Sequence, residues 1–207
     1  MAGMDAEAWN QRYHESDLVW SAGPNQFVEA ELAGLQPGRA VDLACGEGRN
    51  AIWLARQGWR VTAVDFAVAG LEKGRTLAEG LDIEWLCADA TTWRRGHHEP
   101  AYDLAVVAYL QVAAPERRAA VRNAYDSLRP GGTFMLVAHD STNLTEGTGG
   151  PQDPLVLMTA EDVLTDLDGE RFRVERAGRV ARQVGDGHGE EPAATAWDCL
   201  VRVVRRG

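Results

Sequence analysis

The sequence predicts an α/β fold, in which a doubly wound and mostly parallel sheet carries helices on both faces. Short β-branched runs alternate with amphipathic stretches along most of the chain, which is the pattern of strand–helix–strand units. A glycine-containing bend follows the first of these runs, where such folds bind ligands. The chain has 207 residues, enough for one domain with a sizeable core and few for two, so we expect a single domain over residues 1–207.

Short apolar runs predict the strands of the parallel part of the sheet. They lie at residues 39–43, 60–65, 83–87, 102–108 and 133–138, and the last follows a predicted turn at Pro130-Gly131-Gly132. Amphipathic stretches predict helices between them, at residues 51–57, 67–78 and 115–128. Gly58 ends the first helix and Pro115 begins the third, as glycine and proline often do at these positions.

The end of the chain departs from this alternation. A capping-box pattern that begins at Thr159 predicts a helix over residues 159–167. Two strands follow, at residues 172–180 and 195–204, with no clear helix between them. They predict an antiparallel hairpin at one edge of a seven-stranded sheet, whose strand order the sequence does not give.

The segment before the first strand, residues 1–36, is rich in aromatic side chains: Trp9, Tyr13, Trp20 and Phe27. Aromatic faces attract cations, so this segment can form a helical lid over a positively charged ligand. It can equally be a helix that covers the sheet with its apolar stripe. The remaining predicted parts are a cofactor-binding core at 37–139, a substrate loop at 140–158, and a C-terminal helix with edge strands at 159–207.

Composition and charge limit the partners. The net charge of −10 argues against nucleic acid held through its phosphates, because such proteins usually present a basic face. No apolar run is long enough to span a bilayer, and the polar N-terminus is not a signal peptide. Cys45, Cys87 and Cys199 lie far apart without metal-site spacing, which argues against a disulfide framework and a zinc site. We therefore expect a cytoplasmic protein with a small-molecule substrate and no metal.

The most informative segment is the bend after the first strand, Val41-Asp42-Leu43-Ala44-Cys45-Gly46-Glu47-Gly48-Arg49-Asn50-Ala51. Glycines at such a bend allow positive φ and let a ligand lie against bare backbone. The spacing Gly46-x-Gly48-x-x-Ala51 also satisfies a relaxed dinucleotide-binding pattern. Asp42 is a poor neighbour for a pyrophosphate and a good one for an ammonium group. The bend therefore favours a nucleoside that carries positive charge.

Two more carboxylates follow neighbouring strands. Asp65 ends the second strand, where it can accept hydrogen bonds from ribose hydroxyls. Asp89 follows the third strand, where the amino edge of an adenine can lie. With Asp42 they form a set of three carboxylates, and Arg49 alone does not make a pair of arginines aimed at two phosphates.

Residues 38–138 resemble the class I S-adenosylmethionine-dependent methyltransferases in the order of their motifs. The similar segments are Asp42-Leu-Ala-Cys-Gly46-Glu-Gly48, Val64-Asp65-Phe66, Ala88-Asp89-Ala90 and Leu128-Arg-Pro-Gly-Gly-Thr133. Ala44 departs from the family pattern, which has its first glycine there. The wider chain is similar to small bacterial methyltransferases of the tellurite-resistance and thiol-methylating type. That similarity lies in Trp9-Asn-Gln-Arg12-Tyr13, in Trp20 and in the run from Gly46 to Ala55.

The resemblance implies a Rossmann-like sheet, S-adenosyl-L-methionine as the cofactor and S-adenosyl-L-homocysteine as its product. Carried onto this chain, it implies a set of cofactor-binding residues around the bend and the ends of the strands. They are Trp9, Arg12, Trp20, Asp42, Ala44, Gly46, Gly48, Arg49, Asn50, Asp65, Phe66, Asp89, Ala90 and Ala108.

The loop at residues 140–158 is long, polar and glycine-rich, and loops of this length are more often functional than idle. His139 is a candidate general base on an acceptor hydroxyl or thiol, held in one tautomer by a carboxylate, or else a histidine that caps a strand. Tyr109 can line the sulfonium, position the acceptor or simply pack. The predicted catalytic residues are His139 and Tyr109, and the predicted substrate residues are Tyr109, Gln111, His139, Asp140, Asn143 and Gln152.

We therefore expect transfer of a methyl group to a small acceptor by in-line displacement, with a thiol, a metalloid oxyanion, a hydroxyl and an amine all open as acceptors. A catalytically silent protein that binds S-adenosylmethionine or a nucleoside for regulation is the alternative. A nicotinamide-dependent oxidoreductase is a third reading. Affinity for the methyl donor and turnover with an acceptor distinguish the three.

Overall fold

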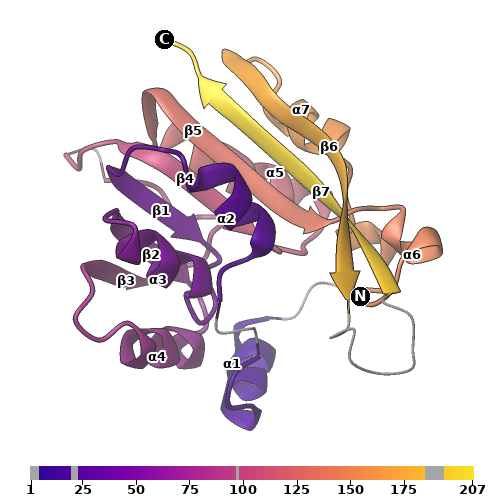
Figure 1. The fold of residues 1–207 in the computed structure, drawn as a ribbon, viewed down its shortest axis with the longest axis horizontal. Helices are drawn as coiled ribbons and strands as arrows, with labels where there is room; N and C mark the ends of the chain where they lie inside the picture. Colours follow the sequence, from indigo (N-terminus) through magenta and orange to yellow (C-terminus); the bar gives the residue numbers. More distant parts are fainter. Residues whose placement is uncertain (1–4, 20–22, 97, 185–193) are drawn as a thin grey trace.

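The computed structural model describes residues 5–19, 23–96, 98–184 and 194–207. A seven-stranded sheet runs through its centre, with the strand order β3-β2-β1-β4-β5-β7-β6 (Figure 1). The strands are β1 (Arg39–Leu43), β2 (Arg60–Asp65), β3 (Ile83–Cys87), β4 (Tyr102–Ala108), β5 (Leu128–His139), β6 (Phe172–Val184) and β7 (Ala194–Arg205). Neighbours from β3 to β5 pair in parallel, whereas β7 is antiparallel to both β5 and β6. This confirms the predicted sheet, with its antiparallel hairpin at one edge.

Helices flank the sheet on both faces. They are α1 (Ala6–Glu15), α2 (Gln26–Leu32), α3 (Arg49–Arg56), α4 (Val68–Leu77), α5 (Ala114–Asp126), α6 (Asn143–Glu146) and α7 (Ala160–Asp166), with a 3₁₀ turn at Pro154–Val156. Side chains of each strand alternate between two buried clusters, as the pleat requires. On β5, Met135 and Val137 pack in the cluster with α2 and α3, and Phe134 and Leu136 in the cluster with α5 and α7.

The predicted bounds of β1, β2, β3 and β4 agree with the structure, whereas β5 begins earlier than predicted. Leu128 already pairs with Tyr102, and the register shifts before Thr133 pairs with Leu104. The expected turn at residues 130–132 is therefore an irregularity inside β5 rather than a turn before it. Pro130 has no backbone N–H to give to a ladder, and the chain bulges around it before pairing resumes.

The end of the chain follows the prediction closely. α7 begins after Thr159, whose side chain accepts a hydrogen bond from the amide of Asp162, while Asp162 accepts from the amide of Thr159. This is the reciprocal capping box that the sequence indicates. β6 and β7 are longer than predicted, running to Val184 and Arg205.

The N-terminal segment forms two separate helices. α1 packs against α4, with Tyr13 buried beside Ala67 and Ala69. α2 lies over the sheet, where Val28 and Leu32 join the core. Its amphipathic side therefore covers the sheet, whereas α1 lies beyond the ends of the strands (Figure 1).

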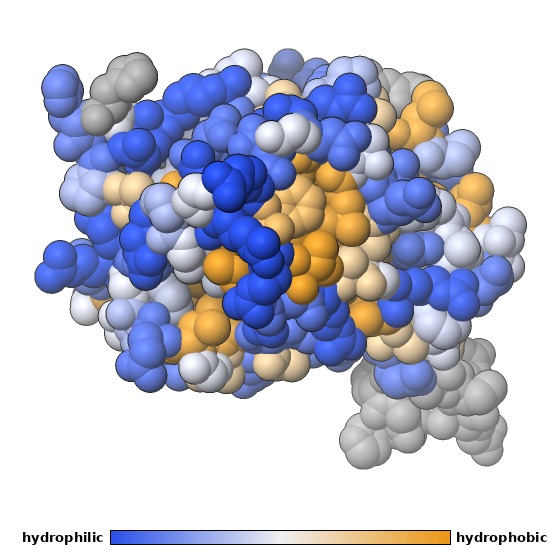
Figure 2. Space-filling view, turned by 90° about the horizontal axis from the view of Figure 1, so that it is seen from above, coloured by the Kyte–Doolittle hydropathy of each residue, from blue (hydrophilic) through white to orange (hydrophobic). Residues whose placement is uncertain are grey.

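Loops that follow the parallel strands gather at one edge of the sheet, the lower edge in Figure 1. The opposite edge is seen in Figure 2, where a mainly hydrophilic surface surrounds an apolar patch. Among the described residues no helix is long and apolar enough to cross a membrane. The carboxyl ends of parallel strands are where folds of this type hold ligands, so the site is built at the lower edge.

Candidate active site

The bend between β1 and α3 has the backbone that a ligand cradle requires. Ala44, Gly46 and Gly48 all have positive φ, at 59°, 58° and 76°. A side chain at Gly48 would collide with the Trp85 ring, so this glycine is needed for packing as well as for its φ. Ala44 keeps the left-handed conformation in spite of its methyl group, a strain of about 1 kcal/mol or more that the surrounding fold imposes. The departure from the family pattern at Ala44 therefore does not change the path of the bend.

Asp42 is a fully buried carboxylate beside this bend. Neither of its oxygens makes a hydrogen bond of good geometry among the described residues, although the Ala51 amide is close enough to lower its pKa. Burial raises the pKa of Asp42 to about 7; Asp65 adds to the shift, against the Ala51 amide and the Arg49 guanidinium. A buried acceptor without a donor is rare in folded proteins and calls for an external partner. The ammonium of a bound methionine moiety fits this need.

Asp65, at the end of β2, holds the bend in place. Its two carboxylate oxygens accept hydrogen bonds from the amides of Gly46 and Ala67, each at 2.8 Å. Burial raises the pKa of Asp65, although both amides lower it. Each carboxylate oxygen can accept more than one hydrogen bond, so the predicted contact with ribose hydroxyls stays open to Asp65.

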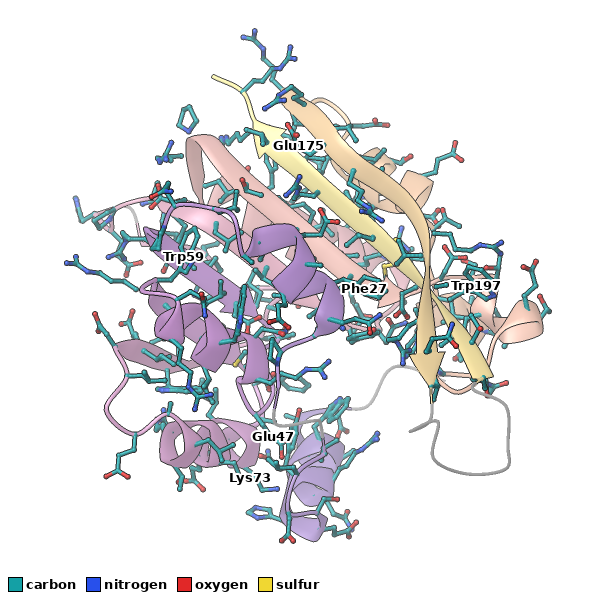
Figure 3. The ribbon with its side chains drawn as sticks, in the orientation of Figure 1. Phe27, Glu47, Trp59, Lys73, Glu175 and Trp197 are labelled. Atoms are coloured by element: carbon teal, nitrogen blue, oxygen red, sulfur yellow. The ribbon has the colours of Figure 1, made fainter. Side chains whose placement is uncertain are left out.

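Glu47 was not predicted as a site residue, yet it connects the bend to the N-terminal segment. Its carboxylate accepts hydrogen bonds from the Val19 amide, at 3.2 and 3.1 Å, and lies 3.3 Å from the ammonium of Lys73. The same ammonium donates to the carbonyl of Ser16. Glu47 and Lys73 lie together between α4 and α1 (Figure 3). A buried glutamate in a glycine bend is the signal that could have indicated this contact.

Asn50 and Asn25 form a second connection of the same kind. The amide of Asn25 donates to the side chain of Asn50 at 2.9 Å, and the Asn25 side chain caps α2. Asn25 also donates to the hydroxyl of Tyr109 at 3.3 Å. Asn50 therefore orders the chain around the site, and its predicted contact with the cofactor stays a prediction.

Tyr109, a predicted catalytic and substrate residue, directly follows β4. It is a non-glycine residue with a φ of 57°, in a conformation that costs free energy and is common at functional sites. Its hydroxyl donates to Asp198 at 2.8 Å, and burial raises its pKa. The guanidinium groups of Arg49 and Arg182 lie 5.9 and 5.8 Å from the centre of its ring. Tyr109 is thus fixed in place and stays protonated at neutral pH.

His139, the last residue of β5, lies beside Tyr109, with the two ring centres 5.0 Å apart. Its Nδ1 is buried and lies 3.3 Å from Oδ1 of Asp198, outside the angle of a good hydrogen bond. The backbone of Gly150 packs against the same ring. The structure thus brings together the two predicted catalytic residues and adds Asp198, which the sequence analysis did not select.

The predicted substrate residues of the following loop mostly hold the loop itself. Gln111 accepts from the amide of His139 at 3.1 Å and donates to the carbonyl of Val156 at 2.6 Å. Asp140 accepts from the amide and hydroxyl of Thr142, at 2.9 and 2.7 Å. The carboxylate that faces His139 is therefore not its neighbour Asp140. A substrate role for Gln111 and Asp140 stays a prediction.

The side chain of Asn143 is buried and bonded at both ends to backbone. It accepts from the amide of Trp197 at 2.7 Å and donates to the carbonyl of Gly149 at 2.9 Å. Gln152 is exposed and donates to the carbonyl of Gly150 at 3.3 Å. The bond of Asn143 to Trp197 ties the loop to β7, and neither Asn143 nor Gln152 forms a hydrogen bond with His139 among the described residues.

The predicted adenine side lies at the ends of β2 and β3. Asp89 is exposed and accepts from the amide of Thr91 at 2.7 Å, while the carbonyl of Ala90 accepts from Asn123 at 2.9 Å. Phe66 is half-buried next to Asp65. Ala108, at the end of β4, packs with the α2 and α3 core.

The aromatic residues of α1 contact one another and α4. Trp9 stacks on Tyr13 with ring centres 5.5 Å apart, and the guanidinium of Arg12 lies 5.2 Å from the Trp9 ring. Their contact with a cofactor stays a prediction, and the predicted Trp20 lies outside the described residues. Among the described residues no group of three or more histidine, cysteine or carboxylate side chains could hold a metal ion.

Comparison with known proteins identifies this architecture. Residues 40–132 match a family model described as "Methyltransferase domain". A ubiquinone biosynthesis O-methyltransferase of Alkalilimnicola ehrlichii is 29% identical over 111 residues, which are 53% of this chain and 45% of that protein. These matches identify residues 40–132 as a methyltransferase domain, and they support the class I S-adenosylmethionine-dependent methyltransferases as its family. The match with the Alkalilimnicola ehrlichii protein spans less than half of that protein's length.

Two further comparisons extend over most of this methyltransferase. Thiocyanate methyltransferase 1 of Brassica oleracea is 23% identical over 176 residues, covering 81% of this chain and 75% of that protein. The N-methyltransferase NodS of Bradyrhizobium japonicum WM9, solved in complex with S-adenosyl-L-homocysteine, superposes with a TM-score of 0.73. It is 18% identical and the match covers 99% of this chain and 100% of NodS, so it shows the fold alone.

The residues present fit S-adenosylmethionine. The bend offers bare backbone at the start of α3, and Asp42 offers a buried acceptor that lacks a well-placed donor among the described residues. This arrangement would hold an amino acid moiety with its ammonium toward Asp42, while Asp65 is placed for ribose hydroxyls. The family and its cofactor thus agree with the physical properties of the bend.

Proposed function

We propose that the chain transfers a methyl group from S-adenosylmethionine to a small-molecule acceptor at the carboxyl edge of the sheet. The observation that carries this proposal is Asp42, a fully buried carboxylate without a hydrogen bond of good geometry among the described residues, next to a bend in which three residues have positive φ. An ionised carboxylate that is buried without a partner destabilises the cofactor-free protein, and a bound cation would remove this cost. A catalytically silent binder would use the same features, so turnover decides between the two.

The chain's own residues divide into two groups in this proposal. Asp42, Asp65 and the bend hold the cofactor, which when bound supplies an electrophilic methyl group on a sulfonium. Tyr109 and His139 lie on the acceptor side, beyond the end of β4. We propose that the described residues 5–19 and 23–36 of the N-terminal segment cover the cofactor and that residues 140–158 cover the acceptor. The contacts of Glu47 and Asn50 with residues 19 and 25 support the first of these assignments.

Two of the matched relatives support a small acceptor of more than one kind. One is named for ubiquinone biosynthesis and O-methylation, another for thiocyanate, and both names describe small molecules. The net charge of −10 favours such a substrate over a nucleic acid held through its phosphates. The cysteines Cys45, Cys87 and Cys199 are free, which agrees with a cytoplasmic location.

Calorimetry with S-adenosylmethionine, S-adenosylhomocysteine and NADH tests the cofactor. We expect the first two to bind and NADH not to bind; affinity for NADH alone would reject the proposal. Product formation is then measured by mass spectrometry against thiols, metalloid oxyanions, phenols and amines. Binding without methylation of any acceptor would favour the regulatory alternative.

A further inference from the structure

Near the proposed acceptor, the carboxylate of Asp198 lies against three polar side chains. It lies on β7, fully buried, and its register partner across the antiparallel pair is His139. Its Oδ2 accepts from the hydroxyl of Tyr109 at 2.8 Å and from Nε of Arg182 at 2.6 Å, while Oδ1 faces Nδ1 of His139. Side chains from β5, from β6 and from the end of β4 thus meet at one carboxylate of β7.

We propose that Asp198 is a positioning residue that keeps the proton of neutral His139 on Nδ1, so that Nε2 accepts the proton of an acceptor hydroxyl. This inference rests on the proposed function and deepens it, because it names the substrate class. The class is a hydroxyl that is still protonated at neutral pH, such as a phenol.

The charge on Asp198 determines the tautomer. Burial raises the pKa of Asp198, but the donors around the carboxylate lower it overall, so the group is ionised at neutral pH. An anion 3.3 Å from Nδ1 stabilises an N–H at that nitrogen and repels a lone pair. A neutral imidazole has a single N–H, so Nε2 is left with its lone pair.

The position of the ring agrees with this role. Nδ1 is buried, so the 15% of the His139 side chain that stays exposed belongs to other atoms of the ring. Tyr109 and Gly150 pack against the ring and restrict its rotation. A base that can neither turn nor exchange its nitrogens presents one atom to the acceptor.

Other groups near the acceptor are already engaged. The hydroxyl of Tyr109 donates to Asp198, and burial raises its pKa, so it is no base at neutral pH. Asp140 is adjacent to His139 in sequence but binds Thr142. His139 is therefore the group on this side that can take a proton.

The step balances with these groups alone. As the new oxygen–carbon bond forms, the carbon–sulfur bond of the donor breaks and its electron pair returns to sulfur, which becomes a neutral thioether. The hydroxyl proton moves to Nε2, and Asp198 stabilises the resulting imidazolium. An acceptor that is already an anion, such as thiocyanate, would have no proton to give and no need of this pair.

Nitrogen-15 NMR of the histidine side chains tests the inference without cofactor or substrate. We expect His139, assigned by comparison with H139Q, to be the Nδ1–H tautomer at neutral pH, whereas free imidazole side chains favour Nε2–H. In Asp198→Asn the Nε2–H form should appear, because the amide can donate to Nδ1. Glu146→Gln, which removes a carboxylate in the same loop that pairs with Arg179 instead, should leave the His139 tautomer unchanged.

An Nε2–H tautomer in the wild-type protein would overturn the inference, and so would a His139 tautomer that D198N leaves unchanged. If D198N does not fold, the wild-type spectrum decides alone. In a second arm, catechol is offered as the phenolic acceptor. His139→Ala should lower kcat by about 100-fold or more while the affinity for S-adenosylhomocysteine stays the same. If the wild-type protein does not bind S-adenosylhomocysteine, that result would instead contradict the proposed function.

Discussion

Asp42 and Asp198 are both wholly buried carboxylates at the carboxyl edge of the sheet, and they differ in almost every other respect. Asp42 ends up on the parallel half with no well-placed hydrogen-bond donor among the described residues, and its pKa is raised to about 7. Asp198 lies on the antiparallel half among Tyr109, Arg182 and His139, and its pKa is lowered. Neither side chain is exposed to solvent, so the difference in pKa comes largely from the partners.

The difference indicates what each half of the site is for. A buried carboxylate whose donor is missing is placed for a cation from outside the chain, as the cofactor requires. A carboxylate whose donors all come from the chain is placed to hold those donors, as an acceptor site requires. The parallel half is therefore incomplete without its ligand, whereas the antiparallel half is already organised.

The largest expected effect is on how stability depends on pH. The folded state keeps a proton on Asp42 that the unfolded chain releases above about pH 4, so the contribution of Asp42 to the free energy of unfolding should fall as pH rises from about 4 to about 7 and level off above that. This fall is on the order of 4 kcal/mol at most. Urea unfolding at several pH values should show it as a difference between the wild-type protein and Asp42→Asn that changes over this range. Equal slopes for the two proteins would contradict the raised pKa.

Removing Asp198 should have the next largest effect on stability at neutral pH. Asp198→Ala leaves Arg182 and Tyr109 without their common acceptor and removes the anion beside His139, which should cost about 3 kcal/mol of unfolding free energy. Asp42→Asn should not destabilise the cofactor-free protein at pH 7. The two urea curves, measured side by side, test the contrast directly, and a loss of stability in both variants would remove it.

Substitutions of the two aspartates should also differ in their effect on the affinity for the cofactor product. Asp42→Asn removes the anion proposed to face the ammonium, so the affinity for S-adenosylhomocysteine should fall about 10-fold to 100-fold. Asp198→Asn should leave that affinity within about twofold, because Asp198 lies on the acceptor side. Calorimetry on folded protein gives both numbers. Equal losses of affinity in the two variants would mean that the parallel and antiparallel halves of the site are not independent.

The smallest expected effect comes from a surface pair on the antiparallel half. Arg179 and Glu146 are both substantially exposed, so Glu146→Gln should change the free energy of unfolding by less than about 0.5 kcal/mol. Thermal or urea unfolding checks this. A larger loss would show that the loop after β5 contributes to global stability, and it would then be an unsuitable control for Asp198.

Most of the fold could be predicted from local patterns. The apolar runs of β1, β2 and β4 are buried on both faces, so their ends coincide with the ends of the runs. The limits of β5 could not be read in this way, because strand pairing continues around the irregularity at Pro130. The strand order, with β7 between β5 and β6, depends on contacts between distant segments.

The residues of the site likewise fall into two groups, those that could be predicted from the sequence and those that could not. Asp42, Gly46, Gly48 and Asp65 could be selected from sequence because a short segment and the end of one strand carry them. Asp198 could not, since a single aspartate in an apolar strand has no partner in its own sequence neighbourhood. Its importance comes from the antiparallel register, which places it opposite His139.

The alternation of strands and helices, the bend and the carboxylates beside it follow from residues close together in the chain, so they could be predicted from the sequence. Which carboxylate has well-placed donors depends on the packed fold. Solvation and hydrogen bonding of a buried group depend on every segment that packs around it, and the side chains around Asp198 come from three segments far apart in the chain.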